Sequence, residues 1–391
     1  MKKLLSITAT LLTIAAVSAA DAPKIGIAGG PYLQAVGERE FTVVWTTDAD
    51  AVAWVEVAPD DGTHFYSCSR PKYYQTRLGR RNVGTLHTVR VTGLAPATTY
   101  RYRILYQGVA GSEKKGRLRY TTARASDVFR HKPFSVTTLD RSKDTVRFAV
   151  ANDMHEHDAE LRALFKDARS EHYDFVCFNG DMTSSIPDEQ HIFRHYMSSA
   201  SELFATDTPL YVARGNHENR GDSALRFIDW FPTSEGKPYF AFRQGPAYFI
   251  VLDGGEDKPD DDIEYTGLAQ YDAYRTEEAE WLKRTLASEE CRTAPIKIAV
   301  CHIPPSIKGW HGGAEIAQKF VPLLNGAGID LMLSAHIHRY RLDPAGTENR
   351  KFPVLCNPNQ CRLDATVTAH GAEIKIVNVE GQTIHEYKIE K

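Results

Sequence analysis

The chain has 391 residues, a formal net charge of −3 and charged residues at 25% of its positions. This length is enough for two domains that each bury a core, and the slightly acidic balance excludes the basic patch that nucleic-acid binding requires. Six cysteines are too few for a fold held together by disulfides. Cys356 and Cys361 are close enough in the sequence to form a local disulfide, a point that the sequence leaves open.

The first twenty residues have the three parts of a secretory signal peptide. Lys2 and Lys3 precede an apolar run over residues 4–17, and the small residues 18–20 follow it. The apolar run is shorter than the roughly 20 residues of a membrane span. We therefore expect removal of residues 1–20, export to the periplasm or the medium, and no membrane anchor beyond the signal. A buried N-terminal helix is the alternative, and it leaves the three-part pattern unexplained.

Residues 21–123 predict an all-β sandwich. Polar and apolar side chains alternate in short runs such as 41–47, between turns rich in Gly, Pro and Asp, and no helical period is present. Tyr100 and the segment before it resemble the tyrosine corner of fibronectin type III domains, and Trp45 is similar to their core tryptophan. Residues 31–34 (PYLQ) resemble the opening of the N-terminal domain of purple acid phosphatases.

The pattern changes after a connector that we place at residues 124–143. From residue 144 to the end of the chain, apolar strand-like runs alternate with helical stretches, and the last 25 or so residues return to alternating strands. This order predicts an α/β domain over 144–391, with two mixed sheets inside and helices on both outer faces, an αββα arrangement of four layers.

Five short polar motifs each follow one of the apolar runs of this domain. They are Asp153-Met154-His155, Gly180-Asp181, Gly215-Asn216-His217-Glu218, His302 and Ala335-His336-Ile337-His338. The runs are typical of buried strands, so the polar residues gather at the carboxyl ends of strands, where open α/β sheets place their sites. Mixed histidine, carboxylate and amide ligands favour Zn, Mn or Fe over calcium.

In this order the motifs resemble those of the calcineurin-like metallophosphoesterase superfamily. The resemblance implies hydrolysis of phosphate esters at a centre of two transition-metal ions (Fe, Mn or Zn), with Asp181 as the carboxylate that bridges them. Such a pair of ions can hold the attacking and leaving oxygens of an in-line displacement. The implied ligands are Asp153, His155, Asp181 and His338 for one ion, and Asp181, Asn216, His302 and His336 for the other.

His217 is not itself a ligand in this superfamily, although it follows a ligand directly. We predict that it protonates the leaving oxygen, so that His217 and the bridging Asp181 are the catalytic residues. Glu218 is a candidate for orienting His217 or contacting the substrate. Trp310 and His311 are candidates for substrate contact, because their loop follows His302 closely.

Two positions depart from the purple acid phosphatases. Ser184 stands where those enzymes have a tyrosine, and His155 stands where they have no histidine. We therefore expect no ferric-tyrosinate colour. Ala335 replaces the usual glycine of its motif and removes no ligand.

The acidic and aromatic segment 256–274 has two interpretations. A solvated surface loop is the commoner explanation of a charge run. The alternative is a loop over the site, with Tyr265, Tyr271 or Tyr274 in contact with the leaving group.

The predicted function is an exported phosphatase that acts on phosphate monoesters, with a small-molecule or phosphorylated partner as substrate. A phosphodiesterase or nucleotide-directed hydrolase of the same superfamily is the alternative. Arg214 and Arg339 beside the motifs are candidates for binding a dianion, but ordinary surface arginines explain them equally well. A catalytically silent binding protein or adhesin is the alternative from another class, and the presence of every implied ligand argues against it.

Overall fold

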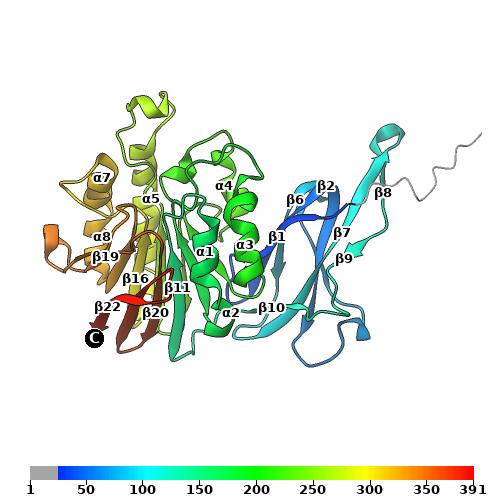
Figure 1. Cartoon of the computed structure of the whole chain (residues 1–391), viewed down its shortest axis with the longest axis horizontal. Helices are drawn as coiled ribbons and strands as arrows, with labels where there is room; N and C mark the ends of the chain where they lie inside the picture. The colour runs from blue at the N-terminus through cyan, green and yellow to red at the C-terminus, as the bar shows by residue number, and fades with distance from the viewer. Residues whose placement is uncertain (1–24) are drawn as a thin grey trace, which may run out of the picture.

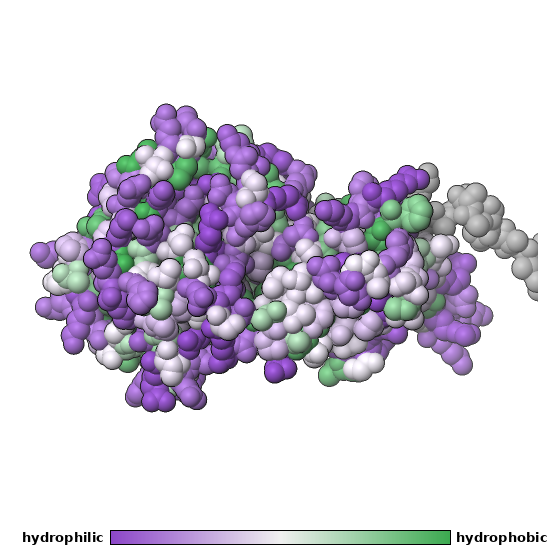
Figure 2. Space-filling view, turned by 90° about the horizontal axis from the view of Figure 1, so that it is seen from below, coloured by the Kyte–Doolittle hydropathy of each residue, from purple (hydrophilic) through white to green (hydrophobic). Residues whose placement is uncertain are grey.

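The computed structural model describes residues 25–391, which form a larger and a smaller body (Figures 1 and 2). The predicted signal peptide lies outside the described residues. Within the described part of the chain, no helix is both long and apolar enough to cross a membrane. Hydrophilic side chains cover most of the face seen in Figure 2. All six cysteines are free, so Cys356 and Cys361 form no disulfide.

The smaller body is organised around one long strand, β2 (Glu40–Pro59). Its first half pairs with β1 (Ile27–Gln34) and β6 (Gly84–Thr92), and its second half pairs with β3 (Lys72–Tyr74) and β7 (Thr99–Ser112). The short strands that pair with β7 are β8 (Leu118–Tyr120), β9 (Arg124–Ala125) and β10 (Phe134–Thr137). A separate two-stranded ribbon consists of β4 (Thr76–Arg77) and β5 (Arg80–Arg81).

Both halves of β2 contribute to one apolar cluster, in which Trp45 is fully buried. The hydroxyl of Tyr100 accepts a hydrogen bond from the backbone N–H of Ala95 at 2.9 Å, which is the tyrosine-corner contact. The prediction of a sheet-rich N-terminal domain is therefore confirmed.

The larger body contains two six-stranded sheets. In spatial order, the first sheet consists of β13 (Leu210–Ala213), β12 (Phe175–Asn179), β11 (Thr145–Ala151), β20 (Cys361–Thr368), β21 (Gly371–Asn378) and β22 (Thr383–Glu390). The second consists of β14 (Phe240–Gln244), β15 (Ala247–Leu252), β16 (Ile296–Cys301), β17 (Leu331–Ser334), β19 (Val354–Cys356) and β18 (Arg341–Asp343).

The two sheets pack face to face. On β11, Val146, Phe148 and Val150 belong to the cluster between the sheets, whereas Ala149 and Ala151 belong to the cluster under the outer helices. This alternation follows the period of a strand and buries both faces, and each large apolar side chain contributes about 1.5–3 kcal/mol. The strand is therefore apolar along nearly its whole length, as its sequence indicates.

Helices cover both outer faces (Figure 1). Those on the first sheet are α1 (Asp158–Phe165), α2 (Ala168–Glu171), η3 (Phe193–Met197), α3 (Ser198–Ala200), η4 (Ser201–Ala205) and α4 (Phe227–Trp230). Those on the second are α5 (Tyr271–Leu286), α6 (Glu289–Thr293), α7 (His311–Lys319) and α8 (Val321–Ala327). The predicted four-layer α/β fold is thus confirmed.

The two bodies share part of their core. Tyr32 and Val44 of the smaller body lie in the same apolar cluster as Phe193 and Trp230 of the larger one. The hydroxyl of Tyr32 also donates to the carbonyl oxygen of Trp230 at 2.8 Å. The smaller body therefore packs on the helical layer of the first sheet, and it also reaches the edge strand β13, where the hydroxyl of Tyr211 donates to the carbonyl oxygen of Val36 at 2.8 Å.

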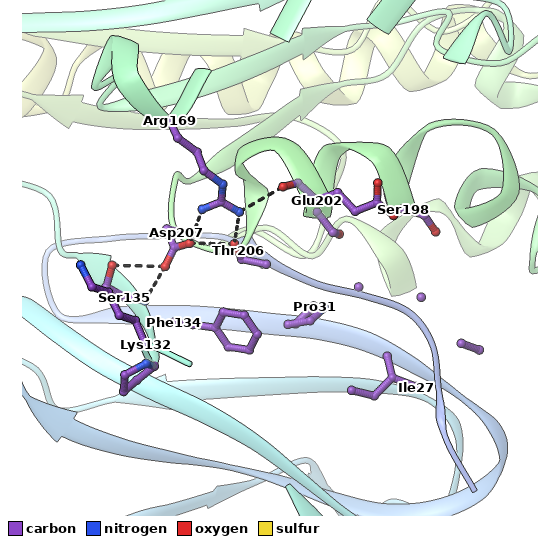
Figure 3. Close-up of a pocket in the computed structure, with 15 residues that line it drawn as sticks. Ile27, Pro31, Lys132, Phe134, Ser135, Arg169, Ser198, Glu202, Thr206 and Asp207 are labelled. Atoms are coloured by element: carbon purple, nitrogen blue, oxygen red, sulfur yellow. Dashed lines mark hydrogen bonds and ion pairs between the residues drawn. The ribbon is translucent and has the colours of Figure 1, made fainter. Parts of the chain in front are cut away.

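A cavity of about 770 Å³ opens at this junction (Figure 3). Asp207 accepts a hydrogen bond from the backbone N–H of Ser135 at 2.7 Å and pairs with Arg169 at 2.7 Å, so it ties the two bodies together. None of the predicted metal ligands lines this cavity.

Candidate metal centre

The predicted ligands meet where parallel strands of the two sheets end. Strands β11, β12 and β13 run parallel in the first sheet, and β15, β16 and β17 run parallel in the second. The residues that follow the ends of these strands within three positions are Asp153, Asp181, Asn216, His302 and His336. His155 and His338 each lie two residues further along. The structure thus gathers all seven side chains from five chain segments at one edge.

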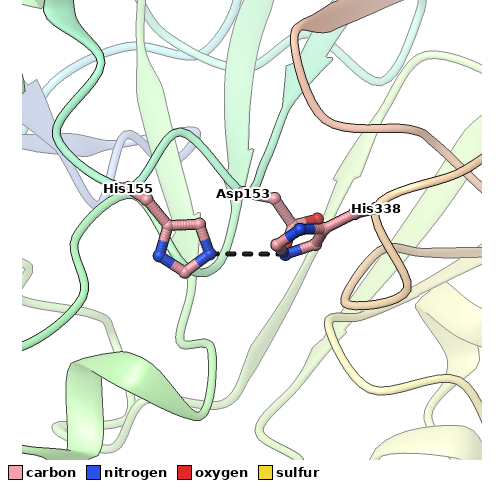
Figure 4. Close-up of side chains that lie close together, drawn as sticks. All are labelled: Asp153, His155 and His338. Carbon is pink, nitrogen blue, oxygen red and sulfur yellow. Dashed lines mark hydrogen bonds and ion pairs between the residues drawn. The ribbon is translucent and has the colours of Figure 1, made fainter.

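Asp153, His155 and His338 form a first group (Figure 4). Nε2 of His338 lies 3.2 Å from Oδ1 of Asp153 and 3.3 Å from Nε2 of His155. Oδ2 of Asp153 accepts a hydrogen bond from the backbone N–H of His336 at 3.0 Å, whereas the buried Oδ1 has no hydrogen-bond partner among the described residues. A buried carboxylate oxygen is costly without a partner, so this group fits a cation between its three ligand atoms.

Asp181, His302, His336 and Asn216 form a second group. Nε2 of His302 lies 3.0 Å from Oδ2 of Asp181. One terminal atom of the Asn216 amide lies 3.0 Å from Nδ1 of His336 and 3.3 Å from Oδ2 of Asp181. With nitrogen at that position the amide donates to both neighbours, and with oxygen there it joins the other acceptors in facing one point. The second orientation is the one that a cation would stabilise, and it fits an ion with mixed nitrogen and oxygen ligands.

Asp181 lies between the two groups. Its ligand atom is within 4.8 Å of those of His155 and His217, and also within 4.8 Å of those of His302 and His336. Its other oxygen, Oδ1, accepts a hydrogen bond from the backbone N–H of His217 at 2.9 Å, which fixes the carboxylate. Its position is that of a residue able to contact two ions at once.

The two histidines of the second group have pKa values shifted in opposite directions. Burial alone would lower the pKa of His302, but the adjacent Asp181 carboxylate raises it to about 10. Burial alone would raise the pKa of Asp181, but the adjacent His302 ring holds it below its usual range. The pKa of His336 is lowered to about 4 by burial. The second group therefore offers a neutral histidine together with an environment that favours positive charge at His302, which a bound cation would supply instead.

The backbone of the centre is strained at the ligands themselves. Positive φ angles are uncommon for residues other than glycine and gather at functional sites. Five of the seven predicted ligands have them: Asp153 (51°), His155 (42°), Asp181 (53°), His336 (70°) and His338 (55°). Three of the five motifs therefore make a sharp turn at the strand end, which brings their side chains toward the common centre.

Two glycines give the ligand loops the room they need. A Cβ at Gly180 would lie 2.5 Å from Nδ1 of His302, and a Cβ at Gly215 would overlap Oδ1 of Asp181. Gly180 also has a φ of 78°, which glycine adopts without strain.

Ser184 and Glu156 support His155, and the sequence analysis assigned a role to neither. Nδ1 of His155 lies 3.3 Å from the hydroxyl oxygen of Ser184, which donates to Glu156 at 2.8 Å. Burial would raise the pKa of Glu156, but hydrogen bonds from neighbouring hydroxyl and backbone groups lower it to about 2. At the position of the tyrosine of purple acid phosphatases, this chain therefore has part of a hydrogen-bonded chain that orients a histidine.

Asp257 is a second residue that the sequence analysis missed. Its Oδ2 lies 3.9 Å from Nε2 of His336, on the opposite edge of the ring from Asn216, and has no hydrogen-bond partner among residues 25–391. Its Oδ1 lies 3.2 Å from Nζ of Lys258. Gly312 allows the close approach, since a Cβ there would lie 2.9 Å from the Cα of Asp257. Asp257 lies in an acidic run, so the sequence did not distinguish this buried carboxylate from its exposed neighbours.

The segment 256–274 therefore begins at the site. Its tyrosines point inward: the hydroxyl of Tyr265 donates to Glu256 at 3.0 Å, and that of Tyr274 donates to Asp253 at 2.6 Å. The structure thus places these two hydroxyl groups against carboxylates of the segment and its preceding strand.

His217 is half-buried beside Asp181. Its Nδ1 lies 2.9 Å from the carbonyl oxygen of Ser184, so Nδ1 carries a proton and donates it. Its Nε2 is the free nitrogen and lies 4.0 Å from Oδ2 of Asp181. The ring also meets that of His155 edge to face, with centroids 4.8 Å apart.

Glu218 has another role than the one predicted. Its buried carboxylate accepts hydrogen bonds from the backbone N–H groups of Asp181 (2.9 Å), Met182 (2.8 Å) and Gly215 (2.9 Å). These contacts occupy both of its oxygens and tie two ligand loops together, so Glu218 neither orients His217 nor faces a substrate.

The other candidates for substrate contact separate. The Trp310 ring is 64% exposed and lies edge to face with that of His336, with centroids 5.4 Å apart. His311 instead turns to α5, where its Nε2 lies 2.8 Å from Asp272. Arg214 is paired with the buried Asp253 at 2.5 Å and is not free to bind a phosphate.

Comparisons with known proteins agree with this architecture. Residues 146–340 match the sequence model of the calcineurin-like phosphoesterases, and residues 30–132 match that of the purple acid phosphatase N-terminal domain. Purple acid phosphatase 21 of Arabidopsis thaliana is 24% identical over 79% of this chain and 65% of its own length. The serine/threonine-protein phosphatase CPPED1 of Rattus norvegicus is 24% identical over 46% of this chain and 56% of its own length.

The solved structure of purple acid phosphatase PPD1 from yellow lupin seeds has the same fold. It aligns with a TM-score of 0.62 at 15% identity, over 92% of this chain and 74% of its own. The chain spans less than two thirds of the length of the first Arabidopsis relative. The chain belongs to the calcineurin-like phosphoesterase family and carries the N-terminal domain of the purple acid phosphatases.

Proposed function

We propose that this protein is a dinuclear metal-dependent phosphoesterase. The observation that carries the proposal is the position of Asp181 between two groups of histidine and carboxylate ligand atoms, each gathered within 4.8 Å, one of which includes the unpartnered Oδ1 of Asp153. One ion is assigned to Asp153, His155, Asp181 and His338. The other is assigned to Asp181, Asn216, His302 and His336. Fe, Mn and Zn all accept this mixture of nitrogen and oxygen ligands.

When bound, such a pair of ions activates a water molecule for attack and neutralises charge on the phosphoryl oxygens. The chain's own residues have three further tasks. Nε2 of His217 faces the centre. In the doubly protonated ring, in which Nδ1–H is donated to the carbonyl of Ser184, the proton on Nε2 is the one in position to be given to the leaving oxygen. Glu218 keeps the loops of Asp181 and Asn216 in register through its three backbone contacts. Asp257 and Ser184 orient His336 and His155 from behind.

Phosphate monoesters are the proposed substrates. The exposed side chain of Arg339 next to His338 makes the approach to the centre more positive, which favours a doubly charged monoester over a singly charged diester. Diester hydrolysis remains the alternative. A comparison of the rates on a monoester and a diester distinguishes the two activities. Purified protein loaded with Mn, Zn or Fe should cleave 4-nitrophenyl phosphate at least tenfold faster than bis(4-nitrophenyl) phosphate.

The same assay decides between an enzyme and a silent binding protein. Elemental analysis should give two metal ions per chain, and removal of the ions by a chelator should abolish turnover. A protein that binds two ions and cleaves neither ester would contradict the proposal. We also propose export, on the basis of residues 1–20. Sequencing of the native N-terminus should start at Asp21 or within a few residues of it.

A further inference from the structure

A second cavity opens directly from the metal centre. It has a volume of about 500 Å³ and lies between the loop that follows β16 and the loop that follows β17. His336 and His338 belong to its lining, so any group bound there is next to the proposed ions. The volume is in the range of small-molecule sites and exceeds what the phosphoryl group alone requires.

One wall of this cavity is apolar and aromatic. It consists of Ile303, Pro304, Trp310 and Ile337. Trp310 is 64% exposed, although its ring is held in place by the edge-to-face contact with His336. A large exposed indole beside a polar centre offers a flat surface for a planar ring, because aromatic rings stack on one another without a need for hydrogen bonds.

A second part of the lining is cationic. Arg339 and Arg341 both line the cavity, and Arg339 is exposed. Arg341 pairs with Asp343 at 3.3 Å. The buried Arg350, which does not line the cavity, pairs with Asp343 at 3.1 Å and with Glu348 at 3.0 Å. Arg339 has no ion-pair partner among the described residues, so its charge makes this part of the lining favour an anion.

We propose that this cavity binds the leaving group of the substrate, and that this group carries a planar ring and a second negative charge. The ring stacks on Trp310, and the second anion pairs with Arg339 and Arg341, while the scissile phosphate sits on the ions. This inference rests on the proposed function, since it assigns the specificity of the same site.

The charge preference is tested with matched aromatic esters. For the metal-loaded protein, kcat/KM for a series of uncharged phenyl phosphates defines a line against the pKa of the leaving phenol. The value for 4-carboxyphenyl phosphate should lie about tenfold above this line. In the Arg339→Gln/Arg341→Gln double variant it should fall onto the line, whereas Arg292→Gln, an exposed arginine on α6, should leave the advantage intact. An advantage that survives the double variant would overturn the proposal.

The ring preference is tested at Trp310. The Trp310→Leu variant should lose about tenfold in kcat/KM on phenyl phosphates and little on glycerol 2-phosphate, which has no ring. Phe129→Leu, which removes an aromatic ring that is 77% exposed in the smaller body, is the control. An equal loss on both substrates would show that Trp310 acts only through His336, and would overturn its assignment as a stacking surface.

A binding measurement separates this proposal from the proposed function. Calorimetry with phenylphosphonate and 4-carboxyphenylphosphonate reports affinity without turnover, and the carboxylated analogue should bind about tenfold more tightly. If neither phosphonate binds and no ester is cleaved, the proposed function itself fails. If both bind equally while phenyl phosphate is cleaved, the function stands and the assignment of the cavity fails.

Discussion

The two bodies of the molecule each bury a histidine, and they use it in opposite ways. His87 of the smaller body lies against the Trp45 ring and bonds to the hydroxyl of Thr47 at 2.9 Å, and burial lowers its pKa to about 4. His302 of the larger body is equally enclosed, but the Asp181 carboxylate beside it raises its pKa to about 10. Burial alone therefore says little about what a histidine does.

The difference between the two lies in their partners. A histidine with a neutral hydroxyl partner remains an uncharged part of the core, and nothing around it asks for a cation. A histidine whose neighbours are carboxylates sits in an environment that favours positive charge, which a proton or a metal ion can provide. Removing the carboxylate should thus make the second kind of histidine resemble the first.

Asp181→Asn is the sharpest way to break this comparison. The amide keeps the shape of the side chain but removes the charge that both ion positions share, so we expect elemental analysis to fall from two ions per chain toward none. His338→Ala, which affects only the first group, should lose one ion. Two ions retained in the Asp181→Asn protein would contradict the assignment of Asp181 as the bridge.

His217→Ala should have the next largest effect, and it should fall on turnover alone. General acid catalysis is typically worth about 10²–10⁴-fold in rate. We expect a loss of this order on an alkyl phosphate, whose leaving oxygen needs the proton, and a much smaller loss on 4-nitrophenyl phosphate. Both ions should be retained. A loss that is the same for both leaving groups would restrict His217 to stabilising charge on the phosphoryl group.

Asp257→Ala should affect one ion only. If Asp257 accepts a hydrogen bond from Nε2 of His336, its loss should weaken the second ion by roughly 10–100-fold, as for other residues that orient a metal ligand. A titration against a chromophoric chelator should show one weakened step and one unchanged step. Asp261→Ala, an exposed aspartate of the same segment, is the matched control. Two unchanged steps would exclude Asp257 from the centre.

The sequence predicted the features that depend only on the pattern of residues along a strand. The alternation around Trp45 predicted the N-terminal sheet, because a half-buried strand needs that period. The runs before Asp153 and His302 predicted buried strands with polar ends, because each run is apolar along nearly its whole length and a polar residue follows it directly. Regular secondary structure converts spacing along the chain into position in space, so these features could be predicted from the sequence.

Residues that support a predicted ligand from another part of the chain could not be predicted from the sequence. Ser184 reaches His155 only because two strands are neighbours, and Asp257 reaches His336 only because the loop passes over Gly312. Glu218 was assigned to the substrate because it follows His217, but its side chain turns inward to backbone N–H groups. Adjacency in sequence is a poor guide once the chain makes a turn at each motif.

His87 supplies the smallest and most selective test of the comparison. Its pKa of about 4 in the folded protein lies below the ordinary value of 6.5, so the folded state resists protonation that the unfolded state accepts. Its contribution to stability is therefore complete above about pH 6.5 and is lost as the pH falls toward 4. At about 1.4 kcal/mol per pKa unit, the loss amounts to roughly 3 kcal/mol.

Urea unfolding at several pH values should show this loss in the wild type. In His87→Gln, which cannot titrate, the dependence on pH should be shallower by about that amount, whereas His131→Gln, at an exposed position, should leave it unchanged. Parallel curves for the wild type and His87→Gln would mean that folding does not shift the pKa of His87. The distinction between a structural and a ligand histidine would then need a different physical basis.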